Sequence, residues 1–115
     1  QGVPLTKFFS LQTPPGKTLI VGSRYIALEC AGFLTELGYD TTVAVRSDKV
    51  LKNFDQDMAN KVKSVMQELG TKFLMETEPV SLGKKSEDSP ITVTFQDGSS
   101  DDYDTVLFAT GRTAA

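Results

Sequence analysis

Histidine and cysteine, two residue types that often perform catalysis, are nearly absent from this chain of 115 residues. It contains one cysteine, Cys30, and no histidine. This composition excludes a disulfide framework, a cysteine–histidine nucleophile pair and the usual zinc sites within the chain. Cys30 stands among apolar residues, which favour the neutral thiol over the thiolate. We therefore expect a core cysteine, no catalytic residue and no metal site in these residues.

The first residues that could bind an anion follow a short apolar run. Leu19-Ile20-Val21 precedes Gly22, and Ser23-Arg24-Tyr25-Ile26-Ala27 follows. A strand, a glycine turn and a helix start form a dinucleotide-binding fingerprint, because the first N–H groups of the helix attract a pyrophosphate. Arg24 replaces the middle glycine, so it either holds the backbone away from the phosphates or contacts them directly. The alternative is a strand-to-helix turn without a ligand.

A second candidate contact, Arg46, lies 24 positions after Gly22. Folds that bind NAD have an acidic residue about 20 positions after the first glycines, where it holds the ribose hydroxyls. Here Ser47, Lys49 and Lys52 follow Arg46 in a chain of net charge −3. A guanidinium–phosphate contact contributes roughly 1.5 to 3 kcal/mol, so Arg46 favours the 2′-phosphate of NADP over NAD by about tenfold or more. Lys49 is explained equally well as a solvated loop residue.

The spacing of apolar residues predicts the elements that position these groups. We expect strands over Thr18–Val21 and Asp40–Val45, with a helix over Tyr25–Leu37 between them that ends at Gly38. Its core-facing positions are Ala27, Cys30, Ala31, Leu34 and Leu37. Asp55 is expected to cap a second helix that ends at Gly70. The apolar residues that share one face of this helix are Met58, Val62, Val65, Met66 and Leu69.

The second half of the chain reads as strands. Lys72–Met75 is expected as the third strand, and a β-meander runs from Val80–Leu82 through Ile91–Phe95 and the Asp97-Gly98 turn. Thr105–Phe108 then returns to the parallel sheet, and Ala109-Thr110-Gly111 follows at its carboxyl end, where open α/β sheets bind ligands. The predicted fold class is α/β, a Rossmann-like parallel sheet with a β-meander crossover in a single domain. Residues 1–16 are expected to be an incoming linker and residues 17–115 the domain.

Charge and hydropathy narrow the classes of partner. A net charge of −3 argues against a nucleic-acid partner, which needs a basic face. No run approaches the roughly 20 apolar residues that cross a bilayer, so no membrane partner is expected. We expect the cytoplasm as the compartment, with the mitochondrion as the alternative.

Longer stretches of the chain resemble a known family. They are Gly22 to Leu34, Val45-Arg46-Ser47, Phe54 to Ala59, Tyr103 to Leu107 and Ala109 to Arg112. Together they resemble the NADPH-binding domain of thioredoxin reductase and thioredoxin–glutathione reductase, within the pyridine nucleotide-disulfide oxidoreductase family. In such enzymes NADPH passes a hydride to FAD, which reduces a cysteine pair that in turn reduces thioredoxin or glutathione disulfide.

The resemblance assigns roles to individual residues. Tyr25 matches the aromatic residue that covers the flavin until NADPH arrives, and Glu29 matches a carboxylate near the nicotinamide. The remaining implied NADPH contacts are Gly22, Ser23, Arg24 and Ile26 at the phosphate turn, Arg46, Ser47 and Lys52 at the 2′-phosphate, and Ala109, Thr110 and Gly111 beside the dinucleotide. The family has a small residue where Arg24 stands.

The family's redox cysteine pair, flavin-binding regions and dimer interface have no counterpart in these residues. The resemblance therefore implies an excised domain, monomeric and inactive alone, that binds NADPH but not FAD. Its parent would be a homodimer with FAD. The alternative is a nonenzymatic NADP-binding or protein-interaction module with a degenerate pocket, which Arg24 motivates.

Overall fold

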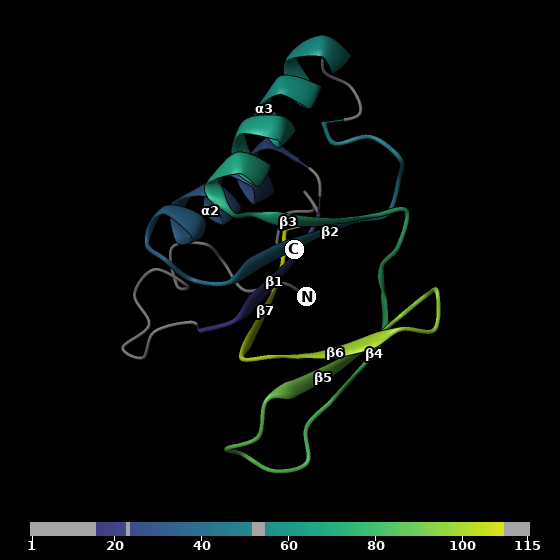
Figure 1. The fold of residues 1–115 in the computed structure, drawn as a ribbon. Helices are drawn as coiled ribbons and strands as arrows, with labels where there is room; N and C mark the ends of the chain where they lie inside the picture. The colour runs from purple at the N-terminus through teal and green to yellow at the C-terminus, as the bar shows by residue number, and fades with distance from the viewer. Residues whose placement is uncertain (1–15, 23, 52–54, 110–115) are drawn as a thin grey trace.

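A computed structural model describes residues 16–22, 24–51 and 55–109 (Figure 1). Most of the expected linker, together with Ser23, Lys52, Thr110 and Gly111, lies outside the described residues. The elements are β1 (Thr18–Val21), α2 (Tyr25–Glu36), β2 (Thr41–Val45), α3 (Gln56–Leu69), β3 (Lys72–Met75), β4 (Pro79–Gly83), β5 (Ile91–Phe95), β6 (Ser100–Tyr103) and β7 (Thr105–Phe108).

The strands form two sheets. A parallel sheet has the order β3-β2-β1-β7, and an antiparallel sheet has the order β4-β5-β6. Figure 1 shows α2 and α3 on one face of the parallel sheet and the antiparallel sheet toward the other. This architecture confirms the predicted α/β fold with a β-meander crossover.

The inner strands of the parallel sheet are covered on both faces. All residues of β1 and β2 are buried. Because successive side chains point to opposite faces, Ile20 packs in the helix-side core, whereas Leu19 and Val21 pack in the core under the meander. Because both faces are covered, the sequences of these strands are continuous runs of residues that favour β-strands, and they do not alternate between apolar and charged residues.

The helix boundaries follow the predicted caps, but some apolar positions lie elsewhere than expected. The Asp55 carboxylate accepts hydrogen bonds from the backbone N–H groups of Asp57 at 2.9 Å and Met58 at 3.4 Å. Gly38 and Gly70 follow the two helices with positive φ angles of 94° and 116°.

The prediction that Leu37 faces the core is wrong, since its exposed fraction is 57%. The shared apolar face of α3 is also only partly in the core. Ala59 and Met66 are buried and Val62 is half-buried, whereas Met58, Val65 and Leu69 remain more than 50% exposed. The reason is geometric, because the part of a helix that contacts a sheet is narrower than the apolar arc that its sequence presents.

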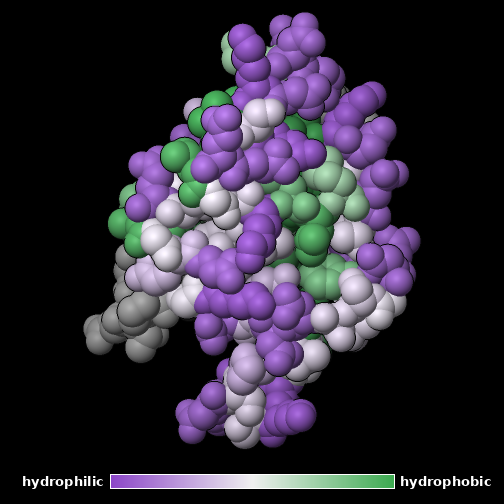
Figure 2. All heavy atoms as spheres, in the orientation of Figure 1, coloured by the Kyte–Doolittle hydropathy of each residue, from purple (hydrophilic) through white to green (hydrophobic). Residues whose placement is uncertain are grey.

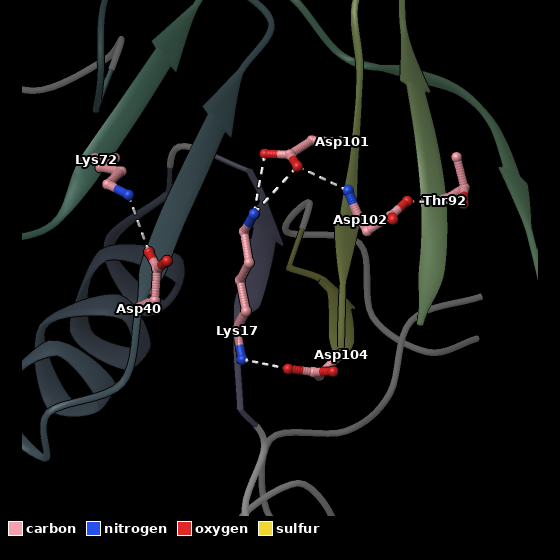
Figure 3. Close-up of polar contacts among 7 residues, drawn as sticks. All are labelled: Lys17, Asp40, Lys72, Thr92, Asp101, Asp102 and Asp104. Carbon is pink, nitrogen blue, oxygen red and sulfur yellow. Dashed lines mark hydrogen bonds and ion pairs between the residues drawn. The ribbon is translucent and has the colours of Figure 1, made fainter. Parts of the chain in front are cut away.

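Lys17 ties the start of β1 to the meander, as Figure 3 shows. Its backbone N–H donates to the Asp104 carboxylate at 2.9 Å, and its Nζ lies 3.1 Å from both carboxylate oxygens of Asp101. The hydrogen bond to Asp101 raises the pKa of Lys17. Burial opposes ionisation of Asp101, but the N–H of Asp102 and the ammonium of Lys17 outweigh it and lower the pKa of Asp101. This contact ties β6 to the amino end of β1.

Candidate functional site

The carboxyl ends of three parallel strands bring the candidate binding residues to one edge. β1 pairs with β2 and β7, so Val21 lies opposite both Ala44 and Phe108. Gly22 N–H donates to the Ala44 carbonyl at 3.0 Å, and Ala109 N–H donates to the Val21 carbonyl at 2.8 Å. Gly22, Arg46 and Ala109 therefore follow three neighbouring strands at the same edge of the parallel sheet.

The turn after β1 depends on glycine. Gly22 has a φ angle of 145°, which residues other than glycine rarely adopt. It lets the chain leave β1 and begin α2 at Tyr25. Arg24 is the N-cap residue of α2 with extended backbone angles, and its exposed side chain makes no capping hydrogen bond. An approaching anion therefore meets the positive end of α2 with a guanidinium beside it.

The outward side of the first turns of α2 is exposed. Tyr25 is 60% and Ile26 53% exposed. Tyr25 and Glu29 lie four residues apart and are both exposed, so they share one face of the helix. Cys30, on the opposite side, is 3% exposed, and burial raises the pKa of its thiol to about 11. Cys30 is thus the core residue expected from its neighbours.

In the turn after β2, two cationic side chains are exposed and the hydroxyl of the serine between them is engaged in hydrogen bonds within the turn. The side chains of Arg46 and Lys49 are exposed. The Ser47 hydroxyl donates to the Lys49 carbonyl at 2.8 Å and accepts a 3.4 Å hydrogen bond from the Lys49 N–H. Ser47 must rotate away from this internal contact before it can donate to a phosphate, whereas Arg46 needs no such change. Arg46 is consequently the stronger candidate for anion recognition.

Sequence reasoning did not identify Glu76 and Thr77, which follow β3. Glu76 N–H donates to the Ser47 carbonyl at 3.1 Å, and Thr77 N–H donates to the Val45 carbonyl at 3.1 Å. The φ angle of Glu76 is 57°, which is uncommon for a residue other than glycine. These two bonds brace the Arg46 turn from the neighbouring strand. Open α/β sheets bind ligands at the carboxyl ends of their strands, and Glu76 and Thr77 directly follow the predicted third strand. Their position after β3 is the signal that could have identified them.

Other kinds of site find no support in the described residues. Within these ranges no group of three or more histidine, cysteine, aspartate or glutamate side chains could hold a metal ion. None of the described helices is both long and apolar enough to span a membrane. Ser23, Lys52, Thr110 and Gly111, which the resemblance also assigns to NADPH, cannot be placed because they lie outside the described residues.

Comparisons with known proteins agree with the fold and the motifs. Residues 17–100 match the family model described as pyridine nucleotide-disulphide oxidoreductase. Thioredoxin reductase from Plasmodium falciparum (isolate FCH-5) is 56% identical over 104 residues, covering 90% of this chain and 19% of that protein. Thioredoxin reductase SEP1 from Emiliania huxleyi is 46% identical over 114 residues, covering 96% of this chain and 23% of that protein.

Solved structures share the architecture. The HOCl-induced flavoprotein disulfide reductase RclA from Escherichia coli superposes with a TM-score of 0.82 at 21% identity, covering 94% of this chain and 24% of that one. LpdA from Mycobacterium tuberculosis gives a TM-score of 0.79 at 26% identity, covering 91% and 22%. The chain spans between 16% and 23% of the length of the curated relatives it matches.

Proposed function

Because the chain belongs to the pyridine nucleotide-disulphide oxidoreductase family, we propose that it is the NADPH-binding domain of a flavin-dependent thioredoxin or glutathione disulfide reductase. Members of this family use a pyridine nucleotide and FAD. The observation that carries the choice of NADPH is the exposed guanidinium of Arg46 at the carboxyl end of β2, where NAD-binding folds have a carboxylate. The whole enzyme's partners, thioredoxin or glutathione disulfide, and its homodimeric state belong to this proposal.

The role of this chain in the enzyme is to bind and orient the nucleotide. The Gly22 turn and the amino end of α2 receive the pyrophosphate, with Arg24 as a second cation beside it. When both cofactors are bound, NADPH supplies a hydride that the flavin accepts. Tyr25 and Glu29 border the nicotinamide end, and the small side chain of Ala109 leaves room beside the dinucleotide. The chain itself carries no group for disulfide exchange, because its one thiol, Cys30, is buried and protonated.

Charge on the turn after β2 decides between the two nucleotides. A 2′-phosphate brings nearly two negative charges to Arg46 and Lys49, both exposed on one turn. NADH lacks that phosphate and gains nothing from these cations. One charge-assisted contact of about 1.5 to 3 kcal/mol corresponds to a preference for NADPH of roughly tenfold or more.

The test is a calorimetric titration of the 115-residue chain with NADPH and NADH at fixed, modest salt. We expect the chain to prefer NADPH, and Arg46→Glu to reduce that preference at least about tenfold, with little change in the affinity for NADH. Lys85→Glu is the matched control, because this substitution makes the same change of charge in the exposed loop between β4 and β5. It should leave the preference intact.

Three results would contradict the proposal. If Arg46→Glu keeps the affinity and selectivity of the original chain, Arg46 does not contact the 2′-phosphate. If the original chain binds NADH as tightly as NADPH, the assignment of the cofactor is wrong. If the chain reduces a disulfide without an added flavoprotein, the proposal that it only binds and orients the nucleotide is wrong.

A nonenzymatic module with a degenerate pocket is the second candidate, and the position of Arg24 favours it. Arg24 occupies the N-cap of α2 without capping it, directly after the glycine turn. Arg24→Gly separates the candidates, because the smaller residue removes both an obstruction and a cation. A large gain in NADPH affinity supports an obstructed pocket, whereas a loss makes Arg24 a phosphate ligand of a working one.

A further inference from the structure

Buried hydroxyl groups differ between the two ends of the parallel sheet. Among the residues that the structure describes, the buried polar side chains are all threonines, namely Thr18, Thr41, Thr42, Thr71 and Thr77. The hydroxyls of Thr18 and Thr41 donate to backbone carbonyls at 3.0 and 3.1 Å. The Thr71 hydroxyl lies 2.6 Å from that of Thr35, and Thr42 forms a hydrogen bond with the Tyr103 side chain. These partnered threonines lie in the first two residues of β1 or β2, or directly before β3.

Thr77 differs from the other four in both respects. Its Oγ1 is closed to solvent and has no hydrogen-bond partner, and the residue as a whole is 5% exposed. Folded chains rarely leave a buried hydroxyl without a partner, because the group has lost its hydrogen bonds to water. Thr77 also follows β3, at the carboxyl edge of the sheet, where open α/β sheets bind ligands.

The residue before Thr77 adds backbone strain at the same place. Glu76 has a φ angle of 57°, which residues other than glycine rarely adopt. The N–H groups of Glu76 and Thr77 donate to the carbonyls of Ser47 and Val45, the two chain neighbours of Arg46. Figure 1 shows the turns after β2 and β3 beside each other, and Figure 2 shows mostly hydrophilic side chains along that right-hand side of the molecule. Strain and an unpartnered hydroxyl therefore coincide next to the turn that carries Arg46.

We propose that Thr77 is a further nucleotide-binding residue, whose hydroxyl obtains its hydrogen-bond partner from the adenosine half of the nucleotide. The inference rests on the proposed function, which puts the adenosine ribose beside Arg46. Adenine nitrogens and ribose oxygens accept hydrogen bonds, so they suit a hydroxyl donor. In the structure the hydroxyl is closed to solvent, so the turn of Glu76 and Thr77 shifts when the nucleotide enters. The strained φ angle of Glu76 lowers the cost of that shift.

The order of the strands assigns the contact to the adenosine half. The parallel sheet runs β3-β2-β1-β7, so Thr77 after β3 lies on the far side of Arg46 from the Gly22 turn after β1. The pyrophosphate and the nicotinamide extend in the other direction, towards α2. NADPH and NADH have the same adenosine. The Thr77 hydroxyl should therefore support the binding of both nucleotides equally, whereas Arg46 favours NADPH alone.

Two substitutions at position 77 test the contact by calorimetric titration of the 115-residue chain. Thr77→Val removes the hydroxyl and keeps the size and branching of the side chain. We expect it to bind NADPH and NADH about three- to tenfold more weakly, the loss that corresponds to one neutral hydrogen bond. Thr77→Ser keeps the hydroxyl and should bind both nucleotides within about twofold of the original chain.

Thermal unfolding without nucleotide separates binding from a structural role. Thr77→Val should unfold at the same temperature as the original chain or higher, because it removes an unpartnered hydroxyl. Thr77→Ser should unfold at a lower temperature, because it loses a buried methyl group. Thr71→Val is the matched control, since the buried Thr71 precedes β3 and its hydroxyl is partnered. It should unfold at a lower temperature and keep the affinity for both nucleotides.

Three results would overturn the inference. If Thr77→Val binds both nucleotides as tightly as the original chain, the hydroxyl does not contact adenosine. If Thr77→Val and Thr77→Ser weaken binding equally, the loss comes from packing. If Thr77→Val unfolds at a clearly lower temperature, the hydroxyl already has a partner within the chain.

The proposed function fails in a different way. A chain that binds NADPH and NADH equally, or an Arg46→Glu variant that keeps the preference, would contradict the choice of NADPH. Equal weakening of both nucleotides by Thr77→Val would still support the contact with adenosine. Binding of neither nucleotide by the original chain would overturn both proposals.

Discussion

Replacing Gly22 with alanine should damage both the fold and the nucleotide site. The φ angle of 145° at Gly22 is essentially reserved for glycine, and an alanine held there costs about 1 to 3 kcal/mol. For a domain of this size, each kcal/mol lowers the melting temperature by about 4 to 8 °C. Gly22→Ala is therefore expected to melt roughly 4 to 24 °C lower.

The loss of binding has a separate cause. To relieve the strain, the chain must change its path between β1 and α2, which moves the first N–H groups of α2 away from the phosphates. A misplaced phosphate contact costs about 1.4 kcal/mol or more, a tenfold loss of affinity for NADPH. Because Arg46 follows another strand, β2, the preference for NADPH over NADH should survive.

Gly98→Ala is the matched control. Gly98 also has a positive φ angle, 91°, and nothing lies within 4 Å of the position that a Cβ would occupy. It sits in the turn between β5 and β6, in the meander rather than in the turn after β1. Gly98→Ala should lose stability by strain alone and keep its affinity for NADPH.

Thermal unfolding followed by circular dichroism gives the stability of both variants, and calorimetry well below both transitions gives the affinities. If Gly22→Ala unfolds at the temperature of the original chain, the turn is not strained. If both variants lose the same affinity, the effect on binding comes from general destabilisation, and the role of the Gly22 turn is refuted.

Three further predictions concern the framework. Asp55→Ala removes the N-cap of α3 and should cost about 1 kcal/mol in urea unfolding, whereas Asp88→Ala, at an exposed loop position, should cost less than about 0.5 kcal/mol; equal losses would refute the cap. The Thr35 hydroxyl donates to a backbone carbonyl of α2 at 2.8 Å, so the buried Thr71 must be the donor in their 2.6 Å contact. Thr35→Val should therefore cost about 1 to 3 kcal/mol and Thr71→Val about 0.5 to 1.5, and the reverse order would show that the donor is misassigned. Burial raises the pKa of Cys30 from 9.0 to about 11, so its contribution to stability is complete below pH 9 and is lost as the pH rises towards 11; Cys30→Ala should flatten that decline in unfolding experiments, and an equally steep decline would contradict the assignment.

Much of the local architecture could be predicted from residue order. The boundaries of β1 and β3 match the expected ranges, and Asp55 and Gly70 bound α3 as their side-chain chemistry predicts. Leu37, Met58, Val65 and Leu69 were harder to place, because periodicity shows which residues share a helix face but not how much of that face the sheet covers.

Some features of the candidate site could be predicted from the sequence, and others could not. The glycine turn, Arg46 and Ala109 were identified from the sequence, because each depends only on a strand end and the few residues that follow it. The bracing of the Arg46 turn by Glu76 and Thr77, and the engagement of the Ser47 hydroxyl within its own turn, emerged only from the folded chain.

The sequence by itself determined where the strands, helices and turns lie, because caps, glycine turns and apolar spacing act over a few neighbouring residues. It also placed Arg46 at the end of the second strand of the fold. Only the tertiary structure decided which apolar side chains remain exposed, such as Ile26 and Leu37, and which distant segments meet, such as Glu76 and Ser47. Burial and contact depend on the packing of residues far apart in the chain, and the local pattern of residues does not contain that information.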